Sequence, residues 1–144
     1  MEEHEEIQQA FSRVPVNRHL GLRLVSRSAE TAVVEMSVHQ DQVQEGGVVH
    51  GGLLSALADT AAVYVFYPSL PEGQSMASIE FKMNFLRPAR VDRGPLVARS
   101  MVLRRGTKVG VCEVEVTQDN LAIAKGLFTY LFMETTAWND ESGN

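Results

Sequence analysis

The sequence is poor in the residues that build disulfides and metal centres: its 144 residues include one cysteine and four histidines. The lone cysteine, Cys112, cannot form an intrachain disulfide, and so few histidines make a structural zinc site a poor explanation. The histidines and acidic residues show no metal-ligand spacing, and no glycine loop typical of nucleotide binding is present. We therefore expect no metal and no other cofactor.

Long apolar runs are also missing. The longest, residues 61–67, is much shorter than the roughly 20 residues that a membrane-spanning helix needs. The first six residues include four glutamates and lack the positive charge and apolar stretch of a secretory signal. The sequence therefore predicts a cytoplasmic globular protein with no membrane partner.

Positive charge is in the minority, with 13 Lys and Arg against 18 Asp and Glu and a net charge of -5. This balance argues against nucleic acid as a partner. Basic residues nevertheless gather between positions 82 and 108, where Asp92 is the only acid. They are Lys82, Arg87, Arg90, Arg93, Arg99, Arg104, Arg105 and Lys108. This stretch fits either a solvated strand face or a patch for a small anionic ligand.

Hydrophobic spacing predicts an α+β protein of one domain over residues 1–144. A helix is expected over residues 2–13, ended by Pro15, then a turn over 16–20 and a loop over 39–49. A second helix over residues 51–67 is apolar on nearly all sides and must be buried. Strands are expected over 22–26, 31–38, 76–86, 95–103, 109–117 and 121–134, with a hairpin turn at Asp119-Asn120 and a frayed polar tail after 134. A mostly antiparallel sheet curved around the central helix satisfies this order.

Asp59 is the first candidate for chemistry, because it lies two turns into the apolar helix, where an unpaired carboxylate is costly. It is either a structural hydrogen-bonding residue or a functional carboxylate. The helix opens with His50, Gly51 and Gly52, and glycines at a helix start let a ligand approach free N–H groups at the positive end of the dipole. The helix therefore carries a site able to polarise a carbonyl together with a nucleophile or base.

Three further residues are candidates. Gln44 can donate an amide hydrogen bond to a carbonyl. His50 is expected either to orient the loop or to meet a leaving group. Ser78 falls on the polar face of a regularly alternating strand and is either a site residue or an ordinary exposed serine. Nucleophilic serine or cysteine catalysis is not supported, since no G-x-S-x-G elbow occurs and Cys112 fits a core position.

The segment from Val49 through His50, Gly51 and Gly52 to Asp59 resembles the signature of hotdog-fold thioesterases of the phenylacetate-degradation type. In that pattern an acidic residue follows His-Gly-Gly nine positions after the histidine. Residues 85–89, with Arg87, and the position of Ser78 also resemble the family. Gln44 departs from the asparagine of many members and resembles the related 4-hydroxybenzoyl-CoA thioesterases, which have Glu where this chain has Asp59.

This resemblance implies a hotdog fold and hydrolysis of an acyl-CoA thioester. Gly51 N–H and Gln44 would hold the thioester oxygen, and Asp59 would attack the carbonyl or activate water, both roles remaining open. The expected substrate-binding residues are Gly52, Arg87, Arg104, Arg105 and Lys108. A hotdog hydratase or dehydratase and a non-catalytic acyl-CoA sensor are the alternatives, and the acyl group is not specified.

Helix geometry adds a prediction about assembly. Gly51 and Asp59 are eight residues apart, about 12 Å along a helix. A carbonyl held about 3 Å from the Gly51 N–H is therefore out of reach of Asp59 in the same chain. Two antiparallel helices from a homodimer satisfy both contacts, and such dimers can pair further into a tetramer.

Overall fold

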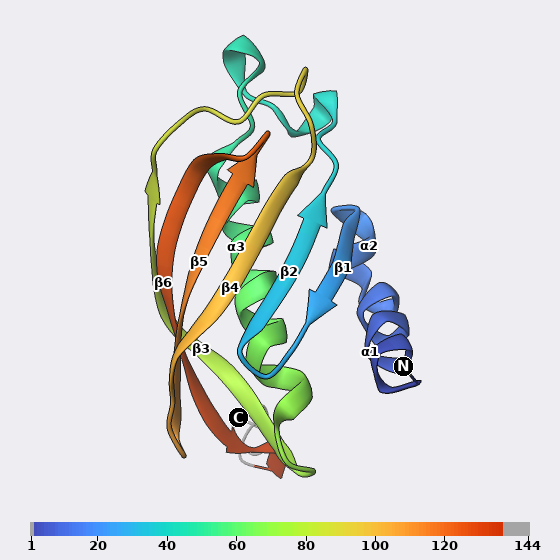
Figure 1. The fold of residues 1–144 in the computed structure, drawn as a ribbon, viewed down its shortest axis with the longest axis vertical. Helices are drawn as coiled ribbons and strands as arrows, with labels where there is room; N and C mark the ends of the chain where they lie inside the picture. The colour runs from blue at the N-terminus through green and yellow to red at the C-terminus, as the bar shows by residue number, and fades with distance from the viewer. Residues whose placement is uncertain (1, 137–144) are drawn as a thin grey trace, which may run out of the picture.

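Within residues 2–136, which the computed structural model describes, a six-stranded antiparallel sheet curls around one long helix (Figure 1). The sheet order is β1-β2-β4-β5-β6-β3. The helices are α1 (Glu2–Arg13), α2 (Pro15–His19) and α3 (Gly51–Phe66). The strands are β1 (Leu22–Arg27), β2 (Thr31–Met36), β3 (Gln74–Phe85), β4 (Leu96–Arg105), β5 (Val109–Gln118) and β6 (Leu121–Glu134). The predicted α+β architecture, a curved sheet around a central helix, is confirmed.

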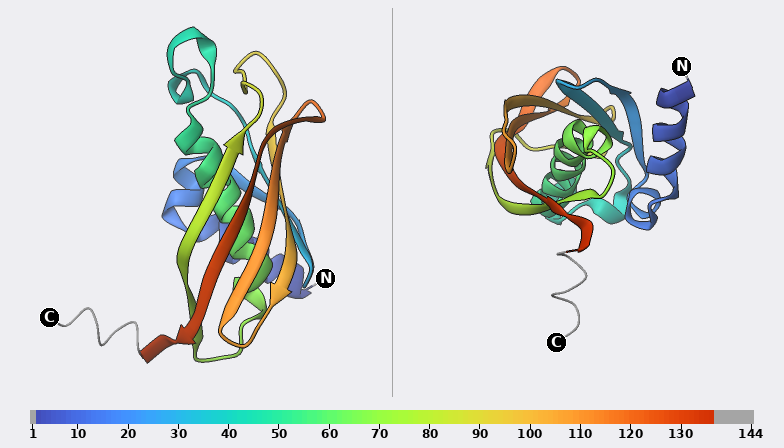
Figure 2. Two further views of the ribbon diagram at one scale, coloured as in Figure 1. Left: turned by 90° about the vertical axis from the view of Figure 1, so that its left-hand side faces the viewer. Right: turned by 90° about the horizontal axis from the view of Figure 1, so that it is seen from below.

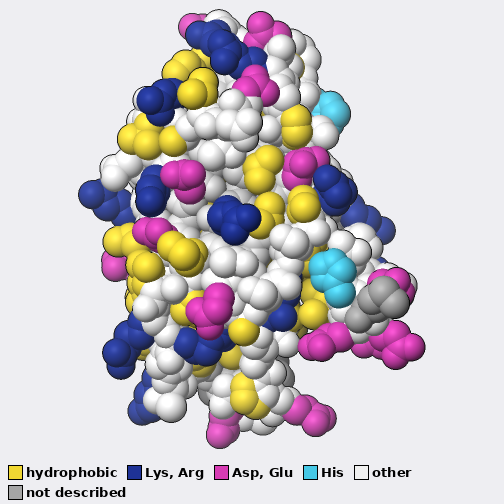
Figure 3. Space-filling view, in the orientation of Figure 1, with side chains coloured by type: hydrophobic (Ala, Val, Ile, Leu, Met, Phe, Trp, Pro, Cys, Tyr) yellow, Lys and Arg dark blue, Asp and Glu magenta, His cyan; other side chains and the backbone are white. Residues whose placement is uncertain are grey.

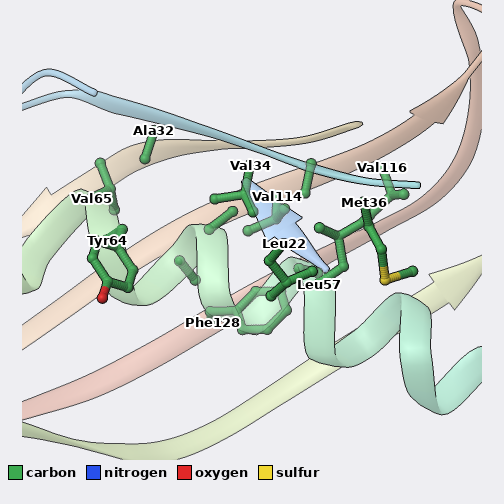
Figure 4. Close-up of a cluster of buried hydrophobic side chains, with 14 of the residues drawn as sticks. Leu22, Ala32, Val34, Met36, Leu57, Tyr64, Val65, Val114, Val116 and Phe128 are labelled. Carbon is green, nitrogen blue, oxygen red and sulfur yellow. The ribbon is translucent and has the colours of Figure 1, made fainter. Parts of the chain in front are cut away.

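The core lies between α3 and the concave face of the sheet, as the view along the helix shows (Figure 2). α3 packs chiefly against β2, β4 and β5, and its alanines at 58, 61 and 62 are fully buried. These small side chains let the helix approach the sheet closely, so that the buried Ser100 hydroxyl donates a 2.7 Å hydrogen bond to the Ala61 carbonyl. Leu57, Val114 and Phe128 fill the space between the two layers (Figure 4).

The N-terminal segment differs from the prediction at residues 16–20. Pro15 ends α1, as expected, but it also starts the short helix α2 in place of the predicted turn. Proline suits the first position of a helix because its fixed φ is helical and that N–H has no intrahelical partner. α1 then lies along β1, where Gln8 donates a 3.1 Å hydrogen bond to the Leu24 carbonyl and Phe11 is buried.

The connections follow the prediction in part. Strand β2 ends at Met36, two residues early, and the loop over 39–49 contains two 3₁₀ turns, Gln40–Gln42 and Glu45–Gly47. A third 3₁₀ turn, Tyr67–Ser69, follows α3. Asp119 and Asn120 both have positive φ, as a two-residue hairpin turn of type I′ requires. The tail predicted to fray lies, from residue 137 on, outside the described residues.

Strand β3 is the long edge of the sheet, and a bulge divides it. Ser78 pairs with Tyr130 and the next pair is Glu80 with Thr129, so that Ile79 is an extra residue. A bulge reverses the alternation of side chains along a strand. Ser78 consequently lies on the concave face, and the prediction that it shares the polar outer face with Glu80 is wrong.

Candidate functional site

Asp59 lies on the side of α3 that faces β6 and the N-terminal half of β3. Its Oδ1 accepts a 2.5 Å hydrogen bond from the phenol of Tyr130, a residue on β6 that is only 1% exposed. Burial, together with the charge of Asp59, raises the pKa of Tyr130. The phenol therefore keeps its proton and remains a hydrogen-bond donor to the carboxylate.

A cavity of about 450 Å³ opens beside this carboxylate. Its polar end is formed by Asp59, Ser78 and Tyr130, which we call the carboxylate half of the site. The rest of the wall comes from α3 and its two neighbouring segments. The residues are Val14, Val16 and Asn17 at α2, Thr60, Val63 and Tyr64 of α3, Tyr67 directly after α3, and Met76 of β3. The Asp59 carboxylate thus borders a largely apolar space.

The N-terminus of α3 carries the second group of predicted residues. His50 is the N-cap, and its Nδ1 accepts a 2.9 Å hydrogen bond from the Gly52 N–H. No hydrogen bond within residues 2–136 uses the Gly51 N–H. Gly51 packs against the ring of Phe85, which a Cβ at this position would approach to 3.3 Å. The cap therefore orients the first turn and leaves the Gly51 donor free.

Gly51 and Gln44 line a separate cavity of about 290 Å³, together with Phe85 and Arg87. We call Gly51 and Gln44 the N–H half of the site. Within one chain the two halves are not brought together, because eight helical positions, about 12 Å, separate Gly51 from Asp59.

The predicted basic residues do not form one patch. Arg87 lies beside Gly51 at the start of α3, whereas Arg105 donates hydrogen bonds to the Val65 carbonyl at 3.1 Å and the Ala29 carbonyl at 2.6 Å. Arg104 and Lys108 lie at the turn between β4 and β5. This turn is about 30 Å along β4 from the β3–β4 loop, which contains Arg93. Figure 3 shows basic side chains near both ends of one face.

Arg105 has a structural role that the sequence did not reveal. Its guanidinium stacks 5.0 Å from the ring centroid of Phe66 and binds a carbonyl at the C-terminus of α3, where a positive charge complements the helix dipole. The expected role of Arg105 in substrate binding stays a prediction.

Tyr130 is the site residue that sequence reasoning missed. It is 71 positions from Asp59 and belongs to an alternating strand whose pattern also fits an ordinary core residue. Its hydroxyl on the concave face was a usable signal, since a buried tyrosine needs a hydrogen-bond partner and Asp59 was the unpaired carboxylate of the core.

No group of three or more His, Cys, Asp or Glu side chains suited to a metal ion occurs among residues 2–136. No helix in that range is long and apolar enough to cross a membrane.

Cys112 is fully buried in β5, and burial, with the charge of Asp59, raises the pKa of its thiol to about 12.

Comparison with known proteins gives the class to which this arrangement belongs. Residues 46–124 match the model of the Thioesterase superfamily, so that the chain belongs to this family of hotdog-fold enzymes. It is 30% identical over 136 residues to the medium/long-chain acyl-CoA thioesterase YigI of Salmonella typhimurium, covering 82% of this chain and 85% of YigI.

Two solved structures share the fold. Thioesterase HI1161 of Haemophilus influenzae superposes with a TM-score of 0.81 at 24% identity, over 90% of each chain. The PaaI protein of Escherichia coli, from the phenylacetic acid degradation operon, gives a TM-score of 0.81 at 24% identity, over 90% of this chain and 91% of PaaI.

Proposed function

We propose that the protein hydrolyses acyl-CoA thioesters to a free acid and CoA. The observation that carries the proposal is the Asp59 carboxylate, held by the buried Tyr130 phenol at the mouth of an apolar cavity. The family and the similarity to YigI support the same reaction. The cavity would take the acyl group and place the thioester carbonyl beside Asp59.

Two routes are open to the carboxylate. As a nucleophile, Asp59 attacks the carbonyl carbon, the carbon–sulfur bond breaks, the CoA thiolate leaves and takes up a proton, and water then cleaves the mixed anhydride. As a general base, Asp59 accepts a proton from the water that attacks the same carbon, the carbon–sulfur bond breaks, and the CoA thiolate leaves and takes up the proton. Ser78, which lines the same cavity, would hold this water or the carboxylate by a hydrogen bond.

The carbonyl needs a donor for the negative charge that develops on its oxygen. The free Gly51 N–H, at the positive end of α3, and the Gln44 amide supply this donor in our proposal. Because the N–H half lies about 12 Å from the carboxylate half of the same chain, the second half must come from another copy.

We infer that β3 is the surface through which two copies meet. It is a 12-residue edge strand that pairs on one side only among the described residues, and its concave face leaves Phe81 and Phe85 about half exposed. The other edge, β1, has six residues and is covered by α1. Antiparallel pairing of two β3 strands would continue the sheet, bury these rings and oppose the two α3 helices. Pairing of dimers into a tetramer stays a prediction.

The CoA moiety would enter from the N–H half. Arg87 lines that cavity, and its Nη1 contacts the Ala122 carbonyl at 2.8 Å, which holds the charge near the start of α3. Gly52 is exposed beside it. Arg104 and Lys108 lie at the far hairpin and would reach a CoA phosphate only from the partner copy.

Exposed contacts between basic side chains and CoA phosphates weaken with salt, so KM for CoA esters should rise with ionic strength.

The test is a panel of acyl-CoA esters with detection of the released thiol. Wild-type protein should release CoA, and Asp59→Asn should lower kcat by about 100-fold or more. Asp92→Asn, which changes an exposed carboxylate that lines neither cavity, is the matched control and should retain full activity. Near-normal kcat/KM in folded Asp59→Asn would overturn the role of Asp59. Hydration of an enoyl-CoA without thiol release would instead support the hydratase alternative.

A further inference from the structure

We propose that Arg87, Arg90 and Arg93 bind the diphosphate of CoA, and that they do so in the same chain whose Gly51 N–H holds the thioester oxygen. We call these three residues the arginine loop. The inference rests on the proposed hydrolysis of acyl-CoA and adds the position of the nucleotide end of the substrate. It is carried by a cavity, by the free donors of the three side chains, and by the distance of the loop from Gly51.

A cavity of about 190 Å³ lies where the β3–β4 loop passes the ends of β5 and β6. All three residues of the arginine loop line it, together with the neutral residue Gln118. The acids nearest in the sequence, Asp92 and Asp119, do not line it, and neither does any other acid. Three positive charges on one small wall attract an anion of more than one negative charge.

The guanidinium groups of the arginine loop keep most of their donors free. Within residues 2–136, the ion pairs are formed by other residues. Arg87 donates one hydrogen bond from Nη1 to the Ala122 carbonyl at 2.8 Å, and Arg90 Nη1 is 3.5 Å from the Gly46 carbonyl oxygen. A guanidinium has five N–H donors in a planar fork that matches the geometry of a phosphate. The side chains can therefore bind a phosphate without breaking an ion pair of the protein.

The backbone of the arginine loop is held by Gln118 at the end of β5. This side chain is only 2% exposed. Its Oε1 accepts the Arg90 N–H at 2.9 Å, and its Nε2 donates to the carbonyls of Arg90 at 2.7 Å and Gly94 at 2.8 Å. Both amide donors are used in this way, so Gln118 positions the loop and leaves ligand binding to the arginines. A loop fixed in advance loses less entropy when it binds.

The arginine loop lies about one pantetheine arm from Gly51, at the same end of the sheet (Figure 1). The Val49 N–H donates a 2.8 Å hydrogen bond to the Ala89 carbonyl, and Val48 forms a β-bridge with Arg90. Bridged Cα atoms are about 5 Å apart and three residues span at most about 11 Å, so the Arg90 backbone lies within about 16 Å of Gly51. The arm of CoA between the thioester sulfur and the first phosphorus spans about 15 Å when extended, at about 1.2 Å per bond.

The two cavities at this end of the sheet are adjacent, since Arg87 and Pro88 line both. A thioester whose oxygen accepts the Gly51 N–H places its pantetheine arm past these two residues and its diphosphate at the arginine loop. The 3′-phosphate, beyond the ribose, lies farther out. Arg104 and Lys108 of the same chain are about 30 Å away along β4 and are out of reach of this diphosphate.

Three esters of one acid test the inference on the full-length protein: the CoA ester, the dephospho-CoA ester and the N-acetylcysteamine ester, which has no phosphate. Arg90→Ala combined with Arg93→Ala should raise KM at least about tenfold for the first two esters, with kcat within about twofold, and should leave KM for the third unchanged. Arg99→Ala removes an exposed arginine that lines none of the cavities described above, and as the matched control it should leave all three KM values unchanged.

Equal KM values in the wild type and the double variant would overturn the inference, and so would a tenfold effect of Arg104→Ala with Lys108→Ala in its place. An effect that disappears with the dephospho-CoA ester would place the 3′-phosphate at the loop and overturn the assignment of the diphosphate.

Calorimetric titration with CoA itself measures the same contacts without turnover, and its Kd should rise at least about tenfold in the double variant. Absence of thiol release with every ester would therefore count against the proposed hydrolysis. Binding of CoA that does not depend on Arg90 and Arg93 would count against this inference alone.

Discussion

Asp59 and Tyr130 form a hydrogen-bonded pair in which each residue supplies the partner that the other needs. A carboxylate in an apolar helix is costly without a donor, and a buried phenol needs an acceptor. The helix motif around Asp59 could be predicted from local sequence. Its partner could not, because the contact joins residues 71 positions apart and depends on the register of β6 against α3.

Tyr130→Phe removes this donor with almost no change of volume. Hydrogen bonds to charged groups contribute about 1.5–3 kcal/mol, so we expect kcat to fall by about 10- to 100-fold while KM changes little. Acyl-CoA hydrolysis followed by thiol release measures both constants. Thr107→Val, which removes an exposed hydroxyl that lines neither cavity, is the control. If Tyr130→Phe lowers the melting temperature but leaves kcat intact, Tyr130 stabilises the fold without positioning Asp59.

Cys112 should be inert in the folded protein. The residue is fully buried, and its pKa is raised to about 12, so that the reactive thiolate is scarce at neutral pH. We expect no reaction with a thiol reagent at pH 8 under native conditions, and one thiol per chain after denaturation. Rapid labelling of the native protein would contradict this. The same experiment shows whether assays of CoA release are free of background from the enzyme.

At the scale of elements, the first turn of α3 depends on His50. Its imidazole accepts the Gly52 N–H and so performs the task that Ser, Asn or Asp usually performs at an N-cap. His50→Ala should lower the free energy of unfolding by about 1 kcal/mol, and His50→Asn should retain it. Chemical denaturation measures the difference. A large loss of kcat in His50→Asn at unchanged stability would indicate contact with the leaving group instead.

Regular periodicity allowed most elements to be predicted from the sequence, and interruptions of it account for the errors. Strands β4, β5 and β6 alternate over most of their length, and their predicted ranges agree with the structure to within a few residues. The bulge at Ile79 leaves no local trace, because the residues around it still alternate in type. Its effect on Ser78 is fixed only by pairing with β6. The helix α2 was missed because five residues carry too little periodicity to be distinguished from a turn.

At the scale of the molecule, the two edges of the sheet are unequal, and the proposed site requires a second copy at the longer one. Subunit mixing tests this arrangement. Asp59→Asn damages only the carboxylate half, and Gly51→Pro removes only the N–H donor at a helix position that tolerates proline. Refolding the two variants together should form heterodimers with one intact site and one doubly damaged site.

Random exchange in a 1:1 mixture should restore about a quarter of wild-type activity, because half of the dimers carry one good site of two. Each variant refolded alone is the control, and Gly51→Ala, which keeps the N–H, shows how far contact with Phe85 contributes. Both variants must be folded by circular dichroism. No recovery in proven heterodimers would mean that each site lies within one chain.

Because about 12 Å separates Gly51 from Asp59, the proposed pairing makes activity depend on protein concentration. In a monomer, neither half of the site would be complete: Asp59 would lack an oxyanion donor, and the Gly51 N–H would lack a carboxylate. Turnover per chain would fall on dilution and, where copies rarely meet, total flux would grow as the square of the amount of protein. A cell that makes little of it would leave its thioester pool untouched, and a modest increase in synthesis would have a disproportionate effect.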